Sequence, residues 1–242
     1  MNVCVIGNSH VGALKGAWNS LSSIHREINI TFFASRGNSL SDLFYENGKL
    51  ASSSDRVAEF LSYTSGGKRE IVLEDYDTFL LYGIGAVPYR VASGFYSQAV
   101  LAQAIQDFYE DRLFFQIFRS IRKGSDSKIF IGHTPLRSGP DIAEDSATAE
   151  ELSDYRKSIS TINENLFLPK NGEFLTQPAE TISRGGRYTH TKFTRGSERL
   201  AINEKQSGLS HPDGDYGHMN DDYGKVYLDK LLKKIVNTPV SA

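Results

Sequence analysis

The residues that decide the fold stand at the start of the chain, Val3-Cys4-Val5-Ile6-Gly7-Asn8-Ser9-His10. An apolar run that ends in glycine predicts a strand over residues 2–7, buried on both faces. Apolar side chains at helical spacing predict a helix over residues 10–23 directly after it. A strand that leads straight into a helix is typical of a parallel α/β sheet, in which sites form at the carboxyl ends of the strands. Ser9 is therefore expected at such a position.

The rest of the chain continues this alternation. Core strands are expected over residues 28–34, 78–83 and 128–132, and helices over 55–63, 96–122 with a break near Glu110-Asp111, 148–166, and from Asn220 or Asp221 onward. Residues 49–51 and 71–73 are expected to pair as a small side ribbon, and residues 170–212 to be mostly irregular. We therefore expect one three-layer α/β/α domain over residues 1–242, with helices on both faces of a parallel sheet.

Length, composition and charge exclude several classes of protein. A chain of 242 residues with 39% hydrophobic residues can bury a substantial core. The formal net charge of −2 gives no general attraction to nucleic acid or an anionic membrane, so neither partner is expected. No apolar run is long enough to span a bilayer, and no basic segment typical of a signal peptide precedes the first strand. The single Cys4 excludes an internal disulfide, which favours a cytoplasmic protein.

A second informative motif, Asp215-Tyr216-Gly217-His218, precedes the last predicted helix. Serine, histidine and aspartate are the three parts of an activated hydroxyl nucleophile, because the imidazole takes the serine proton and the carboxylate fixes the imidazole tautomer. Asp215 and His218 can share one face of a turn at their spacing. The two ends of the chain together predict Ser9 as nucleophile, His218 as base and Asp215 as its orienting carboxylate.

At these residues the chain resembles the SGNH (GDSL-type) hydrolases. Their first block is a strand ending in Gly-Asp-Ser, where this chain has Gly7-Asn8-Ser9, and their last block is Asp-x-x-His, matched by Asp215 and His218. The resemblance spans nearly the whole chain in block order. It implies a flavodoxin-like parallel sheet and a serine esterase that needs no cofactor and acts on short acyl esters, commonly acetyl groups on carbohydrates.

The resemblance also implies an oxyanion hole. Gly37 fits the glycine of the second block by its position after the second strand. Gly85, in Tyr82-Gly83-Ile84-Gly85, stands where the third block has asparagine. We expect the N–H groups of Ser9 and Gly37 to bind the oxyanion, with Gly85 facing them without a side-chain amide. Asn38 is a candidate to supply the missing amide.

The proposed catalytic residues have simpler interpretations as well. Ser9 could cap the first helix, since serine is preferred there. His218 could be a loop histidine bonded to Asp221 or Asp222. His211 lies near His218 in the sequence, but no carboxylate stands in the matching position before it. The Asp-x-x-His spacing therefore favours His218 as the base.

Other polar residues at strand ends are candidates for substrate contact. His10 could line the pocket or only begin the helix, and His133, after the fourth strand, could donate a hydrogen bond or be a satisfied loop residue. Residues 184–205 carry six basic side chains against two acidic ones, which indicates either a solvated loop or contact with an anionic substrate. The six histidines lack zinc-ligand spacing and no phosphate-binding glycine motif is present, so no metal or nucleotide is expected.

Three functions are compatible with these patterns. The first is a serine esterase that acts on a small acyl ester, with a small molecule or carbohydrate as the alcohol. The second is a non-catalytic protein that binds a carbohydrate or metabolite, which the Gly85 departure favours. The third is an acyltransferase in polysaccharide assembly, in which an acceptor alcohol takes the place of water.

Overall fold

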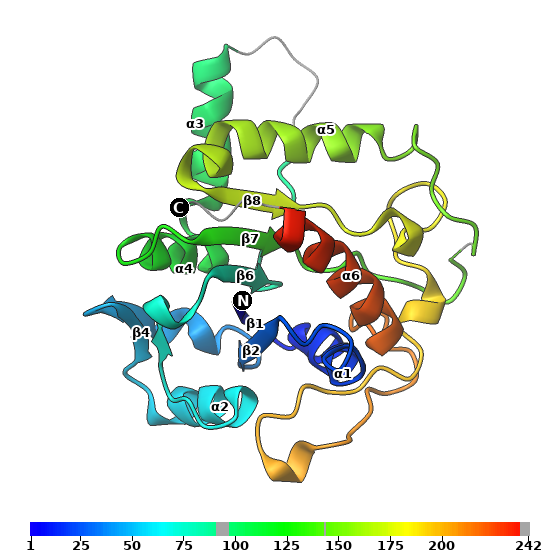
Figure 1. The fold of residues 1–242 in the computed structure, drawn as a ribbon. Coiled ribbons are helices and arrows are strands. Elements are labelled where there is room, and N and C mark those ends of the chain that lie inside the picture. Colours follow the sequence, from blue (N-terminus) through cyan, green and yellow to red (C-terminus); the bar gives the residue numbers. More distant parts are fainter. Residues whose placement is uncertain (91–96, 143, 238–242) are drawn as a thin grey trace.

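The structure is a computed structural model and describes residues 1–90, 97–142 and 144–237, in which strands and helices alternate (Figure 1). Its strands are β1 (Asn2–Gly7), β2 (Asn29–Ala34), β3 (Leu43–Glu46), β4 (Lys49–Ser52), β5 (Ile71–Val72), β6 (Thr78–Tyr82), β7 (Lys128–Gly132) and β8 (Gly172–Leu175). Its α-helices are α1 (Val11–Leu21), α2 (Asp55–Ser65), α3 (Gln98–Glu110), α4 (Leu113–Arg122), α5 (Ser153–Ile162) and α6 (Asp221–Asn237).

The central sheet is parallel and has the strand order β2-β1-β6-β7-β8. Gly7 pairs with Ala34 on one side and with Tyr82 on the other, so β1, β2 and β6 end at one level. After β1 the chain adds β2 on one side of it and then crosses over to add β6 on the other side. The strand order therefore reverses at β1, and open α/β sheets bind ligands at such a switch point. The predicted fold class, a three-layer flavodoxin-like sheet, is confirmed.

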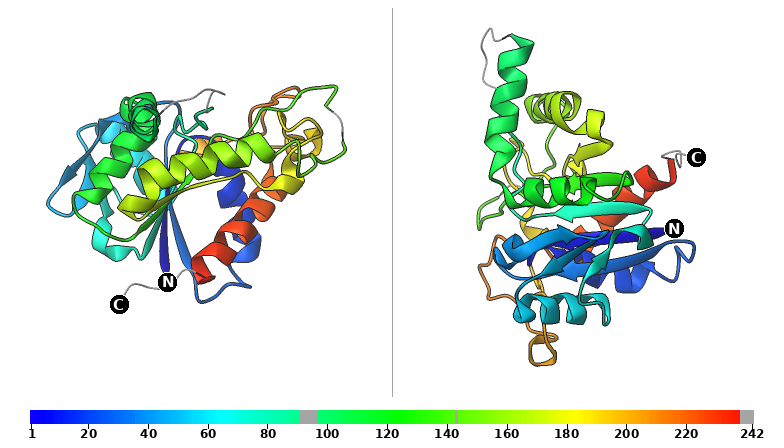
Figure 2. Two further views of the ribbon diagram at one scale, coloured as in Figure 1. Left: turned by 90° about the horizontal axis from the view of Figure 1, so that it is seen from above. Right: turned by 90° about the vertical axis from the view of Figure 1, so that its left-hand side faces the viewer.

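Two helical layers cover this sheet, as the side-chain alternation of β1 shows. Val3 and Val5 pack in a buried cluster with α1 and α6, whereas Cys4 and Ile6 pack in a second cluster with α2, α3, α4 and α5. In the view from above, α1 and α6 lie on one side of the sheet, and α3 and α4 lie on the other (Figure 2). Because successive residues of a strand point to opposite faces, a strand buried on both faces needs apolar residues throughout.

Several local predictions are confirmed and others need correction. The predicted tract over residues 96–122 is divided into α3 and α4 at the expected break, and its first residue lies outside the described ranges. The side ribbon is confirmed by the pairing of β4 with β5, and β3 adds a third strand to it. The helix predicted over residues 148–166 begins only at Ser153. Residues 170–212 are mostly irregular, as expected, but they also contain β8, a four-residue strand at the edge of the sheet that was not predicted.

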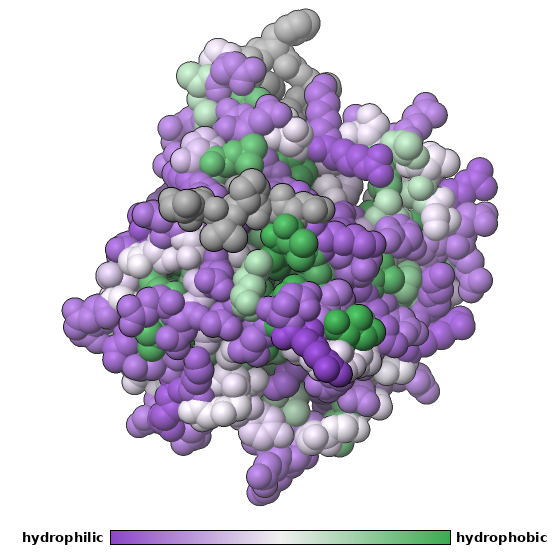
Figure 3. Space-filling view, in the orientation of Figure 1, coloured by the Kyte–Doolittle hydropathy of each residue, from purple (hydrophilic) through white to green (hydrophobic). Residues whose placement is uncertain are grey.

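The described residues include no helix that combines the length and the apolar character needed to cross a membrane. The face drawn in Figure 3 is mostly hydrophilic, with apolar residues in small groups.

A close contact between α1 and α6 brings the two ends of the chain together. Gly224 of α6 lies against α1, where an added Cβ would be 2.0 Å from the carbonyl oxygen of Ala13 and 2.9 Å from Cβ of Ala17. Only glycine allows the two backbones to approach this closely. Because α6 begins three residues after His218, this contact also fixes the position of that histidine relative to the carboxyl end of β1.

Replacement of Gly224 by alanine is therefore expected to lower the free energy of unfolding by about 1–3 kcal/mol, as overpacking does in a tight core. In an unconstrained helix the same change would add about 1 kcal/mol of stability, because alanine is the better helix former. Urea denaturation followed by circular dichroism measures the difference. Lys225→Ala, on the exposed side of the same helix, is the control and should change stability by less than about 0.5 kcal/mol. A stabilised Gly224→Ala protein would contradict the close packing.

Candidate active site

Ser9 lies in a tight turn between β1 and α1. The side-chain oxygen of Asn8 accepts a hydrogen bond from the N–H of His10 at 3.2 Å, so asparagine provides the turn acceptor that aspartate would provide. The carbonyl oxygen of Ser9 accepts the N–H of Gly12 at 3.1 Å. The Ser9 hydroxyl does not cap α1, because Oγ lies 3.0 Å from Nε2 of His218. The capping interpretation of Ser9 is therefore wrong for its side chain.

His218 connects Ser9 to Asp215. Its Nδ1 lies 2.9 Å from Oδ2 of Asp215, while its Nε2 faces the Ser9 hydroxyl. The alternative in which His218 is bonded to Asp221 or Asp222 is not observed. The three predicted catalytic side chains thus form one hydrogen-bonded chain, although 209 residues separate Ser9 from His218.

The Asp215 carboxylate is held in its ionised form by its own loop. Oδ1 accepts hydrogen bonds from the N–H groups of Gly217 at 2.8 Å and His218 at 3.1 Å. Partial burial opposes ionisation, but these bonds and the His218 ring outweigh it and lower the pKa of Asp215 to about 2. An ionised carboxylate only accepts hydrogen bonds, so Nδ1 of His218 carries a hydrogen. In the neutral ring Nε2 then has the free lone pair that can accept the Ser9 proton.

Two further imidazoles flank His218. The ring of His211 stacks on it with centroids 3.9 Å apart, and the centroid of the His10 ring lies 5.1 Å from that of His218. Burial and the nearby His218 lower the pKa of His10 to about 4 and that of His211 below its usual value. Both neighbouring rings are therefore neutral at neutral pH and pack near His218 without adding positive charge.

His211 belongs to the same group of side chains, although it was not predicted to. Its Nδ1 lies 3.1 Å from Oδ2 of Asp215, the same oxygen that His218 contacts. A carboxylate was expected before the histidine, but here Asp215 follows it by four residues. Ligand atoms of His211, Asp215 and His218 lie within 4.8 Å of one another and could hold a metal ion. The i,i+4 spacing of His211 and Asp215 is the sequence signal that could have identified this group.

The two predicted oxyanion glycines lie in the loops after β2 and β6, on either side of the Ser9 turn. Gly37 and Gly85 have φ angles of 59° and 76°, and a Cβ on either would meet nothing within 4 Å. Within the described part of the chain, the N–H groups of Ser9, Gly37 and Gly85 donate no hydrogen bond to any acceptor. These three donors are therefore available to a ligand, and their convergence on one oxygen stays a prediction.

The loop after β6 is strained. Ile84 is buried with a φ of 41°, between Gly83 at 72° and Gly85 at 76°. A β-branched residue in this region costs about 1–3 kcal/mol, and such strain is common at functional sites. Gly83 is also needed for packing, because a Cβ there would lie 2.5 Å from the side-chain oxygen of Asn8. Gly83 and Gly85 let the loop after β6 approach the Ser9 turn. This role of Gly83 was not predicted from the sequence.

Two other predicted contact residues form no hydrogen bond or ring contact with His218 in the described part of the chain. Asn38 is exposed, and no described residue accepts or donates a hydrogen bond with its side chain. His133 is buried with Nδ1 2.6 Å from the carbonyl oxygen of Thr134 and Nε2 2.6 Å from the hydroxyl of Tyr155. Burial lowers the pKa of His133 to about 4. With both nitrogens engaged inside the protein, His133 fits the satisfied-histidine interpretation better than substrate contact.

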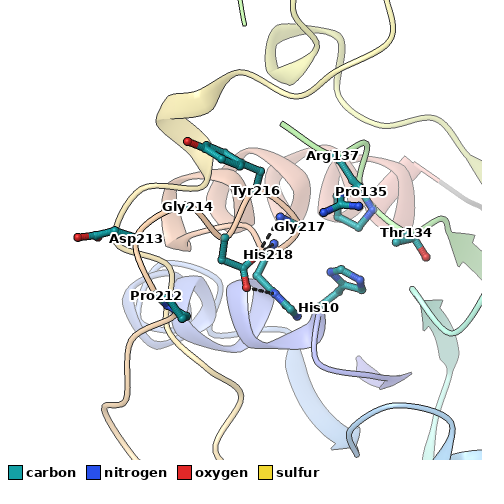
Figure 4. Close-up of a pocket in the computed structure, with 11 residues that line it drawn as sticks. His10, Thr134, Pro135, Arg137, Pro212, Asp213, Gly214, Tyr216, Gly217 and His218 are labelled. Atoms are coloured by element: carbon teal, nitrogen blue, oxygen red, sulfur yellow. Dashed lines mark hydrogen bonds and ion pairs between the residues drawn. The ribbon is translucent and has the colours of Figure 1, made fainter. Parts of the chain in front are cut away.

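A cavity of about 580 Å³ opens beside His218 (Figure 4). The loop after β7 contributes Thr134, Pro135 and Arg137 to its lining. The loop that carries the Asp-x-x-His motif contributes residues 212–218, and His10 completes the lining. A second cavity of about 510 Å³ lies on the other side of the same loop and is lined in part by Arg195 of the basic segment. Residues 212–215 and Tyr216 border both cavities.

No protein-family model matches this sequence, and no curated protein does. Among solved structures, the chain is similar to the periplasmic domain of a lipopolysaccharide acetyltransferase from Salmonella ser. Paratyphi A, with a TM-score of 0.48 and 14% identity over 98% of this chain and 84% of that one. It is also similar to a DUF4886 family protein from Bacteroides uniformis, with a TM-score of 0.39 and 10% identity over 100% of this chain and 87% of that one. Both are distant likenesses of overall fold.

Proposed function

We propose that this protein is a serine esterase that hydrolyses a small acyl ester through Ser9, His218 and Asp215. The observation that carries the proposal is the hydrogen-bonded chain from Ser9 Oγ through His218 to Asp215, with distances of 3.0 and 2.9 Å. This geometry favours turnover over binding alone, because a base already contacts the hydroxyl that must lose its proton. The resemblance to SGNH hydrolases supports an acetyl group as the acyl part and a carbohydrate as the alcohol.

The chemistry uses two steps. Ser9 Oγ attacks the acyl carbon while its proton moves to Nε2 of His218, and the bond between the acyl carbon and the alcohol oxygen then breaks. The leaving oxygen takes the proton from His218, and acyl-Ser9 remains. Water attacks acyl-Ser9 and gives a proton to His218, which returns it to Ser9 Oγ as the carboxylic acid leaves. Asp215 stays ionised throughout and stabilises the imidazolium.

The developing oxyanion would be bound by the N–H groups of Ser9 and Gly37. Both are without acceptors among the described residues, and backbone donors of this kind need no reorganisation during the reaction. Gly85 leaves the third position without a side-chain donor. Loss of one such donor typically lowers the rate by about 100- to 1000-fold, so this hole would support a slow reaction or an activated acyl group.

The direct test is hydrolysis of p-nitrophenyl acetate by the purified protein, followed by release of p-nitrophenolate, with and without EDTA. The chelator distinguishes serine chemistry from chemistry at a metal held by His211, Asp215 and His218. The proposal predicts equal rates in both conditions. Loss of activity in EDTA, restored by a divalent metal, would contradict it.

Replacement of Gly85 by asparagine is expected to raise kcat for p-nitrophenyl acetate by about 10-fold or more, because it adds a side-chain donor to the oxyanion hole. Asparagine tolerates the positive φ of 76° at this position, and nothing lies within 4 Å of its Cβ. Gly85→Asp is the matched control, because it has the same shape with an acceptor instead of a donor and should lower kcat. An unchanged kcat in Gly85→Asn would mean that another donor already completes the hole.

A further inference from the structure

Arg137 brings an uncompensated positive charge to the cavity beside His218. The residue lines this cavity and is exposed, and no described carboxylate lies within ion-pair distance of its guanidinium. In Figure 4 its side chain points toward the His218 side of the cavity. Surface arginines are usually solvated, but the backbone of this one is held in place by hydrogen bonds.

The backbone at Arg137 is fixed by hydrogen bonds on both sides. Its carbonyl oxygen accepts the N–H of Thr189 at 3.0 Å, and the N–H of the next residue, Ser138, donates to the carbonyl oxygen of Tyr216 at 2.8 Å. Thr189 is fully buried and its hydroxyl accepts a hydrogen bond from Nε2 of the buried Gln177 at 2.9 Å. Arg137 is thus tied through its neighbour to the loop that carries Asp215 and His218, and a fixed backbone lowers the entropy lost when its side chain binds a ligand.

The acidic residues of this cavity do not neutralise Arg137. Asp215 is bonded to His218 and to its own loop. Asp213 also lines the cavity, but its side chain points away from His218 in Figure 4. The cavity therefore presents one guanidinium, a group whose fork of donors matches the oxygens of a carboxylate or a phosphate.

The position of His218 shows which part of an ester would occupy this cavity. In the proposed reaction His218 gives its proton to the leaving oxygen, so the alcohol must lie on the side of the imidazole. The oxyanion donors lie instead in the loops after β1 and β2. A charge recognised by Arg137 therefore belongs to the alcohol part of the substrate and not to the acyl group.

We propose that Arg137 is a specificity-determining residue that selects esters whose alcohol part carries a carboxylate or a phosphate near the scissile bond. This inference rests on the proposed esterase function and adds the charge class of its substrate. The contact would be a charge-assisted, bidentate hydrogen bond between the guanidinium and two oxygens of the anion.

The test compares 4-acetoxybenzoate with its neutral analogue, methyl 4-acetoxybenzoate, in the wild-type protein and in Arg137→Gln. The ratio of kcat/KM for the charged ester over the neutral ester should fall by about 10- to 100-fold in the variant, mainly through KM. Intrinsic differences in reactivity cancel because both proteins meet the same two esters. Arg26→Gln is the control, since Arg26 is exposed just before β2 at the opposite edge of the sheet, and it should leave the ratio unchanged.

Two further arms identify the source of the charge. 4-Acetoxyphenyl phosphate tests whether phosphate is preferred to carboxylate, and either preference supports the inference if it depends on Arg137. The second arm compares kcat/KM for mono(4-nitrophenyl) succinate, whose acyl group carries a carboxylate, with kcat/KM for the neutral p-nitrophenyl butyrate. Dependence on Arg137 for the succinate alone would overturn the assignment to the alcohol part.

A binding measurement separates failure of this inference from failure of the esterase function. Titration calorimetry of 4-acetoxybenzoate with Ser9→Ala needs no turnover, and Arg137→Gln in that background should weaken binding by about 10-fold or more. Equal affinities with and without Arg137, or an unchanged kcat/KM ratio, would overturn the inference while hydrolysis of the neutral ester still supported the esterase. Binding that depends on Arg137 without any hydrolysis by the wild-type protein would support the anion site and contradict the esterase.

Discussion

Replacement of Ser9 by alanine is expected to lower kcat/KM for p-nitrophenyl acetate by about 10⁴-fold or more, close to the uncatalysed rate. The reason is that the change removes the only atom that would form the acyl-enzyme, while His218 and Asp215 keep their mutual hydrogen bond. Among the described residues, the Ser9 hydroxyl forms a hydrogen bond with His218 alone, so the fold should be unaffected. Initial rates of p-nitrophenolate release, corrected for spontaneous hydrolysis, measure the effect.

The control for this prediction is Ser22→Ala, which alters an exposed serine at the other end of α1. It should retain wild-type activity, and both variants should show the same thermal unfolding midpoint. Substantial residual hydrolysis by Ser9→Ala, above that of the buffer, would mean that another group carries the reaction.

Replacement of Asp215 by asparagine is expected to lower kcat/KM by about 10³- to 10⁴-fold, although it hardly changes the size of the side chain. The amide oxygen can still accept the N–H groups of Gly217 and His218, which turns the NH₂ group toward Nδ1 of His218. Because two donors cannot face each other, the ring would adopt the tautomer with hydrogen on Nε2 and could no longer accept the Ser9 proton.

The pH dependence of kcat/KM in the wild-type protein follows in part from the low pKa of Asp215. A pKa of about 2 means that the wild-type carboxylate stays ionised well into acid, so protonation of Asp215 should not lower kcat/KM until the pH approaches 2. Asp222→Asn, an exposed acid in the first turn of α6, is the control and should keep activity within about threefold of the wild type. Near-normal activity in Asp215→Asn would contradict tautomer control by this residue.

Much of the fold followed from periodicity, because its core strands are continuous apolar runs between helical patterns. β1 matched its predicted range, and β7 did also, since both are buried on two faces and contain hardly any polar residue. The sequence pattern of β8 was too short and too polar to predict a strand. Its four residues include Gly172 and Glu173, and only its pairing with β7 makes the segment a strand.

The site was predictable where its residues form short motifs. Ser9, Asp215 and His218 were each marked by a local pattern, and the structure brings them into contact through the packing of α6 on α1. His211 and Arg137 were missed as site residues for two different reasons. His211 lies four residues before Asp215, a local spacing that was passed over because a carboxylate was expected before the histidine. Arg137 reaches the site only because its loop is hydrogen-bonded to distant parts of the chain, and no local spacing indicates such contacts.

The most direct test of the account is covalent labelling of the protein with a fluorophosphonate, followed by intact mass measurement and peptide mapping. An activated serine attacks the phosphorus and displaces fluoride, which adds one phosphonyl group per chain. The account predicts a single modification at Ser9, with none in Ser9→Ala and greatly slowed labelling in His218→Ala. Failure of the wild-type protein to react, or modification at another residue with Ser9 untouched, would contradict the claim that Ser9 is an activated nucleophile.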